Sequence, residues 1–491
     1  MRLSRALVPL LLVAAGCNDL EVTNPNQRTT DTFFRDRNDA LLALNATYHG
    51  LQELGAFGRW LAFADDIRSD IGTSRSPWPE LANFTKTVLA SYDFEVNIHL
   101  WQHNYRTIFA ANQVIASVPA VEMDAAERAR FVAEAKFIRA LSYYNLVTLF
   151  GRIPVPLQPS SATDRPASVP AEETWAQIEK DLTEAQADLP LAYSGADVGR
   201  ATKGAALALL GKAHLQQREW PEAAARFAEV VGSGQYTLMP DYGDNFREST
   251  DNNAESIFEV QFSDQNVLSE GSAGYSFPKL AGPCGPAFCD ANPTRWYFDQ
   301  FFVDNPGTPD PRLDYTIFYN KPGGMDVFGR PFADRYADRI NDLFVKKYTQ
   351  WYTTGDEFFD NPINFKVMRL GGILLLYAEA LNENDDVAGA RTQLNRVRAR
   401  VGVTPVPTGL NKDQMRDRIE REQLLELGFE TERFRFLQRQ GRFTAAFLPT
   451  LVAHDSDFSV FEIGRSELLP IPNSEVDLNP GVPQLPGWGG N

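Results

Sequence analysis

Two short helices in immediate succession occupy residues 199–238, and they constrain the fold more than any other stretch of this 491-residue chain. In the first helix, small and aliphatic side chains recur at steps of three and four and therefore share one helical face. These side chains are Ala206, Leu209, Leu210 and Ala213. The second helix begins with Pro221, whose missing N–H would be unbonded at a first helical position, and ends at Gly232. The pattern predicts a helical hairpin.

The spacing within this hairpin follows the tetratricopeptide pattern. Leu210, Gly211 and His214 stand where Leu-Gly-x-x-Tyr is expected, and Ala223 and Phe227 follow at the expected offset. The glycine lets the two helices approach closely, and we expect Phe227 to fill the groove between them. Such a hairpin cannot bury its apolar face alone, so other hairpins must stack on it. We therefore expect a mainly α fold, a tetratricopeptide-like α-α superhelix of helical hairpins.

Helical periodicity recurs on both sides of this hairpin. The expected helices span residues 39–54, 100–118, 125–150, 171–189, 365–381, 387–400 and 411–439. Between residues 240 and 364 the periodicity gives way to Gly, Pro, Asn, Asp and aromatic residues, with one expected strand at 256–262. A loop region of this length is usually functional. We expect an irregular, loop-rich subdomain there, between helical regions at 33–239 and 365–491.

The first 17 residues are typical of a processing signal. Arg2 and Arg5 precede a short apolar run at residues 6–13, and small residues lead to Cys17. A cysteine at this point is typical of a bacterial lipobox, in which the thiol is acylated and the cysteine becomes the new N-terminus; Ala14 stands where Leu is preferred. The alternative is an ordinary secretory signal with a nearby free cysteine. We favour lipid attachment at Cys17, because the apolar run is too short to span a bilayer.

Charge and hydropathy exclude several classes of partner. The net charge is −17 and the pI is near 4.9, without the Lys/Arg clusters that binding to nucleic acid phosphates requires. Residues 18–32 are polar and are expected to form a tether between the lipid and the folded body. No later apolar run reaches membrane-spanning length, so we expect membrane attachment through Cys17 only.

Cys284 and Cys289 lie close together in a Gly- and Pro-rich stretch. In an oxidising compartment, the favoured interpretation is a short disulfide that fixes a loop. Metal binding is the weaker alternative, because no other Cys or His lies nearby in the sequence to complete a site.

The sequence offers little that indicates catalysis or a metal. His99 and His103 are spaced i, i+4 on an expected helix, but the Glu of a His-Glu-x-x-His zinc motif is missing. The paired carboxylates at 65–66 and 385–386 are also explained as helix caps or solvated acids. No Gly-rich phosphate loop and no Gly-x-Ser-x-Gly elbow occurs in a strand-to-helix context. We expect no enzyme activity, no metal and no cofactor.

Several short motifs, in their order along the chain, resemble the SusD/RagB family of nutrient-binding outer-membrane lipoproteins. The resemblance covers nearly the whole chain after the tether. The matching blocks lie at 133–140 (Ala-Glu-x-x-x-x-Arg-Ala), 151–154, 181–190, 199–202, 253–258 (Asn-x-Glu-Ser-Ile-Phe), 310–312 (Asp-x-Arg), 377–380, 394–400 and 469–472 (Leu-Pro-Ile-Pro). The sequence departs from the family pattern at Gln423, Thr431 and Phe436, which puts a local salt-bridge arrangement in doubt.

The resemblance implies an α-superhelix with an irregular subdomain that carries the ligand face. In the family, such a lipoprotein sits on the outer face of the outer membrane. It covers a SusC-like TonB-dependent β-barrel as a lid and passes an oligosaccharide or a peptide inward. The family carries out no catalysis and needs no cofactor. An oligosaccharide is the favoured ligand, with a peptide as the alternative.

Carbohydrate binding requires aromatic faces that stack on sugar rings, together with Asp, Asn and Arg groups that bond to hydroxyls. In the family, two loop regions build this face, one early and one late in the chain. The candidate ligand-binding residues are Asp65, Asp66, Arg68, Trp78, Tyr92, Arg295, Trp296 and Tyr297. For any single aromatic the alternative is packing inside the loops, and we expect two or three of the set to be exposed. Glu134 and Arg139 are expected to be structural, as an inward ion pair or cap.

Two other functions remain open at this point. An exported helical-repeat scaffold that binds protein would have exposed aromatic residues on the concave helical face and none in the loops. A glycan hydrolase on a helical scaffold would need two carboxylates about 5–10 Å apart across a cleft.

Overall fold

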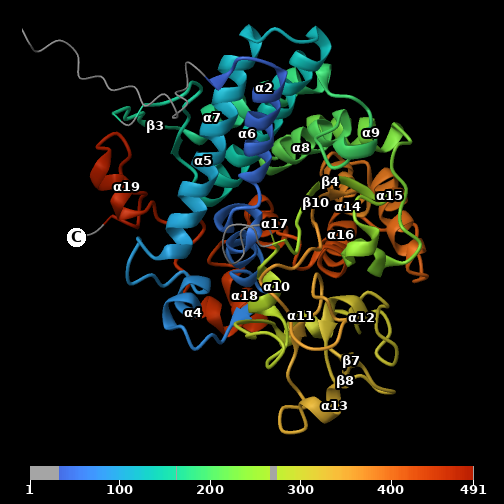
Figure 1. Ribbon diagram of the computed structural model, residues 1–491. Helices are drawn as coiled ribbons and strands as arrows, with labels where there is room; N and C mark the ends of the chain where they lie inside the picture. The colour runs from blue at the N-terminus through green and yellow to red at the C-terminus, as the bar shows by residue number, and fades with distance from the viewer. Residues whose placement is uncertain (1–32, 162, 266–273, 490–491) are drawn as a thin grey trace, which may run out of the picture.

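The computed structural model describes residues 33–161, 163–265 and 274–489 (Figure 1). The predicted signal at 1–17, the tether at 18–32 and the lipid-attachment residue Cys17 lie outside these residues. Within the described part of the chain, no helix is both long enough and apolar enough to cross a bilayer.

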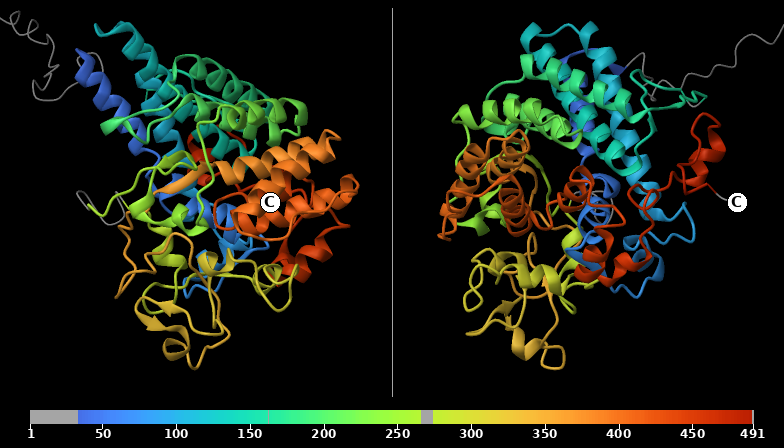
Figure 2. Two further views of the ribbon diagram at one scale, coloured as in Figure 1. Left: turned by 90° about the vertical axis from the view of Figure 1, so that its right-hand side faces the viewer. Right: turned by 180° about the vertical axis from the view of Figure 1, so that it is seen from behind.

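The long helices form one continuous stack in which each helix packs on the next. In packing order they are α2 (Arg37–His49), α5 (Glu95–Ser117), α6 (Ala125–Phe150), α7 (Ala171–Asp188), α8 (Lys203–Gln216), α9 (Trp220–Gly232), α14 (Leu370–Glu383) and α15 (Val387–Arg400). Because α9 packs directly on α14, residues 240–364 form an insertion in the stack. Figures 1 and 2 show this insertion, in yellow and gold, extending away from the layered helices. The predicted tetratricopeptide-like superhelix is confirmed.

The α8–α9 hairpin shows why this stretch organises the fold. Thr202 caps α8 by accepting a hydrogen bond from the Ala205 N–H. A Cβ atom added at Gly211 would lie 2.6 Å from the ring of Phe227, so only glycine permits this approach of the two helices. Phe227 is fully buried in the groove, as the sequence predicts.

Strands β4 (Ser256–Val260) and β10 (Phe365–Arg369) pair antiparallel at the base of the insertion. The predicted strand at 256–262 is thus confirmed in a shorter form, whereas the predicted helix at 365–381 is wrong over its first five residues. The reason is electrostatic, because Lys366 and Arg369 of β10 form buried ion pairs with Glu259 on β4 and with Glu255, which directly precedes β4. Helix α14 begins only after these pairs.

The remaining elements are short. Within the early loops lie a π-helical turn at Leu54–Gly58, α3 (Trp60–Ala62), a second π-helical turn at Phe63–Ile67, β1 (Gly72–Ser74) and α4 (Pro79–Thr85). Strands β2 (Ile153–Pro154) and β3 (Ser168–Val169) pair between α6 and α7. The insertion contains α10 (Phe277–Ala281), β5 (Ala291–Pro293), α11 (Arg295–Gln300), α12 (Leu313–Thr316), β6 (Ile317–Phe318), β7 (Asp326–Val327), β8 (Arg330–Pro331), α13 (Phe332–Arg335) and β9 (Phe344–Val345). The C-terminal part adds α18 (Leu448–His454) and α19 (Asn473–Leu478).

The predicted helix at 411–439 is wrong in its middle, where the chain breaks into α16 (Lys412–Leu427) and α17 (Arg433–Arg439). A Cβ atom at Gly428 would lie 1.9 Å from the hydroxyl oxygen of Tyr297, so the backbone turns against that ring. Phe429 and Thr431 then adopt left-handed φ values of 64° and 61°. Helical periodicity alone does not reveal this turn.

A buried ion-pair network joins the insertion to the helical stack at Glu426 on α16. Its carboxylate lies 2.9 Å from Arg312, 2.5 Å from Arg369 and 2.6 Å from Arg400. Arg369 in turn pairs with Glu255 and Glu430 at 2.8 and 2.7 Å. Burial by itself would raise the pKa of Glu426, but the three guanidinium charges outweigh it and lower the pKa well below its usual range. The carboxylate therefore stays charged inside the protein.

We predict that Glu426→Gln lowers the free energy of unfolding by about 3–5 kcal/mol, because removing one partner leaves buried guanidinium groups without their counter-charge. Urea unfolding at neutral pH, followed by circular dichroism, measures the change. Asp417→Asn on the exposed face of the same helix is the matched control and should change stability by less than about 0.5 kcal/mol. Equal effects of the two substitutions would contradict the structural role of the network.

Candidate ligand-binding face

The two loop regions predicted to build the ligand face lie side by side. Strand β1 pairs antiparallel with β5, with Thr73 opposite Asn292. Thr294 extends this contact, because its N–H donates to the carbonyl of Ile71 at 3.0 Å and its hydroxyl donates to the carbonyl of Asp70 at 2.7 Å. The early loops after α2 and the late loops after α10 therefore form one surface region.

Asp65 and Asp66 do not face a ligand, which corrects their assignment as binding residues. Both are fully buried. Asp65 lies 2.8 Å from Arg435, and Asp66 accepts a hydrogen bond of 2.7 Å from the backbone N–H of Thr431. Burial raises the pKa of both carboxyl groups, most strongly for Asp66. Their role is to fix the turn between α16 and α17 against the early loops.

Arg68 and Tyr297 are also interior residues and are withdrawn from the ligand set. The Arg68 guanidinium lies 4.0 Å from the ring centroid of Phe434, and its Nε donates to the carbonyl of Ala64. The hydroxyl of Tyr297 donates to the carbonyl of Leu424 at 3.0 Å. Both side chains are nearly or completely inaccessible.

Three other candidates are partly accessible. The Trp296 ring stacks on His454 with ring centroids 3.7 Å apart, so one of its faces is covered. Tyr92 packs edge-on against Trp488 and is half-buried. Arg295 is exposed and donates to the carbonyl of Asn341 at 2.8 Å. Trp296 and Tyr92 can therefore each contact a ligand through at most one edge or one face of the ring.

Trp78 is the predicted aromatic that the structure presents most openly. It lies just before α4, and 36% of its surface is accessible. Its ring rests edge-on against Trp60 and Phe94, at 6.4 and 5.1 Å between centroids. The buried Trp60 and the half-buried Phe94 thus hold the Trp78 indole in place, and a large part of this indole faces outward.

Sequence reasoning missed three phenylalanines that continue this surface. Phe288 and Phe358 are 51% and 63% accessible, and Phe359, which adjoins Phe358, is half-buried. The rings of Phe288 and Phe359 lie 5.7 Å apart. Arg59 lies between this pair and the tryptophans, 5.0 Å from the Phe359 ring and 5.1 Å from that of Trp60. We name Arg59, Trp78, Phe288, Phe358 and Phe359 the aromatic face.

A disulfide and a buried carboxyl fix the phenylalanine side of the aromatic face. Cys284 and Cys289 are joined in a disulfide that closes the hairpin next to Phe288. The N–H of Glu357 donates to the carbonyl of Pro286 within that hairpin at 3.0 Å. The buried Glu357 carboxyl accepts hydrogen bonds from the Gln350 N–H and the Asn361 amide at 2.8 and 2.9 Å. The aromatic residues flanking Cys289 and Glu357 were the sequence signal that could have revealed this half of the face.

The histidines are occupied by protein contacts. The rings of His99 and His103 stack at 4.5 Å. Their Nδ1 atoms accept hydrogen bonds from the Trp60 indole and the Gly55 N–H at 3.2 and 3.0 Å. Burial is the main reason why the pKa of His103 falls to about 3. The contacts of this pair therefore hold Trp60 in place beneath Trp78, and they explain the two histidines without a metal ion.

In the described part of the chain, His214 belongs to a group of three side chains that could hold a metal ion. His214 lies near Glu179 and Glu219, and ligand atoms of all three lie within 4.8 Å of one another. The Nδ1 atom of His214 is already 2.6 Å from the Glu219 carboxylate. We explain the group as a hydrogen-bonded cluster at the turn of the α8–α9 hairpin.

Glu134 and Arg139 are structural, which confirms their interpretation from the sequence. Glu134 is fully buried and accepts hydrogen bonds from the Tyr48 hydroxyl and from Arg200 at 2.8 and 3.2 Å. Arg139 forms a bidentate pair with Asp181 at 2.7 and 2.8 Å. These contacts join α6 to α2 and α7.

Comparisons with known proteins agree with this architecture. The model of the SusD family matches residues 254–488, and the model described as starch-binding associating with outer membrane matches residues 20–215. The chain belongs to the SusD family. SusD-like protein P2 of Formosa agariphila is 28% identical over 98% of both chains.

Solved structures of SusD proteins have the same fold. A SusD superfamily protein from Bacteroides vulgatus matches with a TM-score of 0.83 and 24% identity, over 93% of this chain and all of that one. A laminarin-binding SusD-like protein matches with a TM-score of 0.75 and 28% identity over the same shares.

Ion pairs are present around the positions at which the chain departs from the SusD pattern. Gln423 accepts a hydrogen bond of 3.1 Å from Arg439, which also pairs with Glu379 at 2.8 Å. Thr431, where glycine is usual in the family, keeps the left-handed conformation that glycine adopts without strain.

We predict a pH-dependent stability contribution from Glu357. Burial raises the pKa of its carboxyl group from 4.5 to about 7 in the folded protein, so folding favours the protonated form. Stability from this group is therefore greatest below pH 4.5 and is lost as the pH rises through about 7, a loss of about 3 kcal/mol by pH 8.

Glu357→Gln removes this titration. The free energy of unfolding of the variant, measured relative to the unmodified protein, should rise by about 3 kcal/mol between pH 4.5 and pH 8. Urea unfolding at a series of pH values measures the difference. Asp356→Asn, at the exposed neighbouring position, serves as the control and should run parallel to the unmodified protein. If the pH dependence of stability of Glu357→Gln also runs parallel to that of the unmodified protein, the pKa of Glu357 is not raised in the folded state.

Proposed function

We propose that this SusD-family protein is a binding protein that captures an oligosaccharide on the aromatic face. The observation that carries the proposal is the set of exposed rings at Trp78, Phe288 and Phe358. The Arg59 guanidinium links the two sides of this set, because it lies against the rings of Trp60 and Phe359. Ring faces stack on the apolar C–H faces of sugars, and guanidinium groups donate hydrogen bonds to hydroxyls. Binding of this kind breaks no bond and needs no cofactor.

The names of relatives support a glycan ligand. One structural neighbour at 28% identity is described as a laminarin-binding SusD-like protein. The starch-binding protein SusD of Bacteroides thetaiotaomicron is 30% identical over 28% of this chain. Both descriptions name glucose polymers, so glucans are the first ligands to test.

The distribution of exposed aromatic residues favours this function over a protein-binding scaffold. In the described residues, the exposed large aromatic side chains outside the long helices are Trp78, Phe288, Tyr352 and Phe358. Phe109 on α5 is the exposed large aromatic of the helical stack. A scaffold that binds protein through its helical face would need the reverse distribution.

The proposal extends to the cell surface. A lipid on Cys17 would attach the protein to the outer membrane, in agreement with the family description of starch-binding proteins associating with that membrane. There the protein would cover a SusC-like TonB-dependent β-barrel and deliver the captured oligosaccharide to it. The peptide alternative shares this assembly and differs only in the ligand.

We predict that Trp78→Ala and Phe288→Ala each weaken oligosaccharide binding about five- to tenfold, because each removes one stacking surface worth about 1–1.4 kcal/mol. Isothermal titration calorimetry with a panel of glucan oligosaccharides and peptides identifies the ligand and then measures the change. Phe109→Ala removes an equally exposed ring outside the aromatic face and should leave the affinity unchanged. Unchanged affinity in both face variants would remove the aromatic face from the site.

We predict that the native protein sediments with outer membranes and co-purifies with a large β-barrel after detergent extraction. Cys17→Ser should shift the protein from the membrane to the soluble fraction, because the acylated thiol is its anchor. Immunoblotting of fractionated cells and mass spectrometry of the purified complex measure both results. Equal membrane recovery of the Cys17→Ser variant at equal yield would contradict the lipid anchor.

A further inference from the structure

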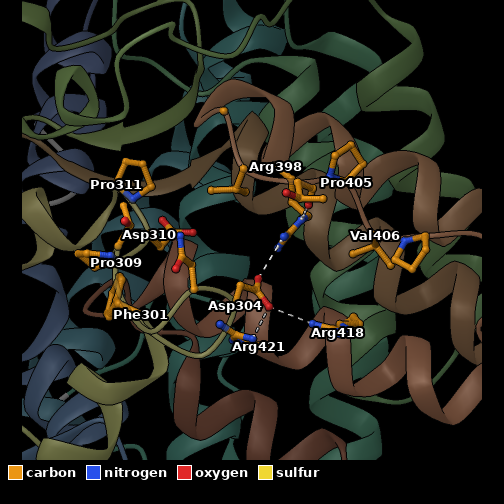
Figure 3. A pocket seen from close by; sticks show the side chains of 16 residues that line it. Phe301, Asp304, Pro309, Asp310, Pro311, Arg398, Pro405, Val406, Arg418 and Arg421 are labelled. Atoms are coloured by element: carbon orange, nitrogen blue, oxygen red, sulfur yellow. Dashed lines mark hydrogen bonds and ion pairs between the residues drawn. The ribbon is translucent and has the colours of Figure 1, made fainter.

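A second surface site lies apart from the aromatic face, between the loop that follows α11 and the loop that joins α15 to α16. It is an open pocket of about 470 Å³ (Figure 3). This volume is within the range of small-molecule sites and exceeds that of a single sugar ring. None of the residues predicted to bind ligand lines this pocket.

Three arginines converge on one carboxylate at the centre of this pocket. Asp304 lies 3.1 Å from Arg398, 3.1 Å from Arg418 and 2.8 Å from Arg421 (Figure 3). Arg398 comes from the last turn of α15, whereas Arg418 and Arg421 are one turn apart on α16. Arginines from two different helices therefore direct their guanidinium groups at the same carboxylate.

The positive charge around Asp304 exceeds the negative charge, because Asp310, the other carboxylate that lines the pocket, is paired with Arg312 at 2.8 Å. Arg398 is neutralised from behind by Glu422, at 2.6 Å. Within the described residues, Asp304 is the only carboxylate that forms an ion pair with Arg418 or Arg421. Two guanidinium groups thus share one carboxylate, at the surface of a chain whose net charge is −17.

Hydrogen-bond donors also remain in excess. Arg418 makes one hydrogen bond in the described structure, to Asp304, and its side chain is 43% accessible. Arg421 donates to Asp304 and to the carbonyl of Gln300, while its buried Nε has no partner there. Planar guanidinium groups with unused N–H donors match the geometry of carboxylate and sulfate oxygens.

Apolar and rigid walls surround these donors. Pro309 and Pro311 line one side of the pocket, and Pro405, Val406 and Pro407 line the opposite loop. Such walls can pack on the C–H face of a sugar ring while the arginines bind a charged substituent. A simple inorganic anion would bind the arginines and make no apolar contact with these walls.

We propose that this pocket binds the anionic group, a carboxylate or a sulfate ester, of an acidic sugar. The anion assignment rests on the arginines alone, and the assignment to a sugar rests on the proposed function. In the unliganded protein Asp304 occupies part of the site as an internal counter-ion. Burial would raise the pKa of Asp304, but the charges of Arg421 and Arg398 outweigh it and lower the pKa, so Asp304 stays ionised at neutral pH. A ligand anion therefore binds against the repulsion of this carboxylate.

The test uses the intact folded protein and three monosaccharide probes at low ionic strength. D-glucuronate carries a carboxylate, D-glucose 6-sulfate carries a sulfate ester, and D-glucose is the neutral control. Ligand-observed NMR titration measures each affinity. We expect one or both anionic probes to bind at least tenfold more tightly than glucose, and the stronger of the two identifies the anion. If neither exceeds glucose, the proposal is overturned.

Paired variants locate the site. Arg418→Gln combined with Arg421→Gln should weaken anion binding at least tenfold, whereas Arg396→Gln, an exposed arginine on α15 outside the pocket, should not. Asp304→Asn should strengthen binding several-fold, because it removes the competing charge. Equal binding by the double variant and the Arg396→Gln control, or weaker binding by Asp304→Asn, would overturn the proposal.

The test also separates this pocket from the aromatic face. Trp78→Ala should leave glucuronate binding unchanged if the pocket is an independent site. A failure of the proposed function would appear as loss of neutral oligosaccharide binding with the monosaccharide anion result intact. A failure of the pocket proposal would appear as intact binding of neutral oligosaccharides without preferential binding of the anionic monosaccharides.

Discussion

The burial of the Glu426 carboxylate among three arginines is the interaction on which the arrangement of the whole chain depends. Arg312 comes from the insertion, Arg369 from the end of β10 and Arg400 from the end of α15, so one carboxylate joins three distant parts of the chain. Each buried charge would be costly alone, and the network is stable only when all partners are present. Because the network needs the insertion, the strand pair and the helices at once, it fixes the loop-rich insertion to the helical stack in one orientation.

This fixed orientation matters because the exposed side chains that could bind a ligand lie on loops. Strands β1 and β5 bring the early and late loops together, and the disulfide between Cys284 and Cys289 fixes the hairpin that carries Phe288. Rings that are already positioned lose little conformational entropy on binding, so more of the stacking energy appears as affinity. Aspartates and arginines near these loops were natural candidates for ligand contacts. The structure uses Asp65, Asp66 and Arg68 instead to support the loops from inside.

The sequence predicted the helical stack well, because apolar periodicity and caps are local signals. Helices α6 and α15 begin and end at the predicted residues. The prediction failed where a long-range contact decides the local structure. One case is β10, whose Lys366 and Arg369 pair with acids on and directly before β4. The other is the turn after Gly428, which the hydroxyl of Tyr297 enforces. The candidate aromatic face was only half predicted for the same reason. Loop position indicates which aromatics are available, but only tertiary packing separates the buried Tyr297 from the exposed Phe288.

Two kinds of surface on one rigid frame suit a protein that captures and then releases its ligand. Stacking on the aromatic face is tolerant of sequence along a glycan, since each ring contact contributes only about 0.5–1.5 kcal/mol. The proposed anion site in the arginine pocket would add discrimination by charge. Asp304 already uses part of the guanidinium donors, so the net gain from a ligand anion would be smaller than three free guanidinium groups would give. The overall charge of −17 opposes anionic ligands at long range and confines their attraction to the pocket itself. Both features would limit affinity, and limited affinity is what the proposed delivery of the ligand to a transporter requires.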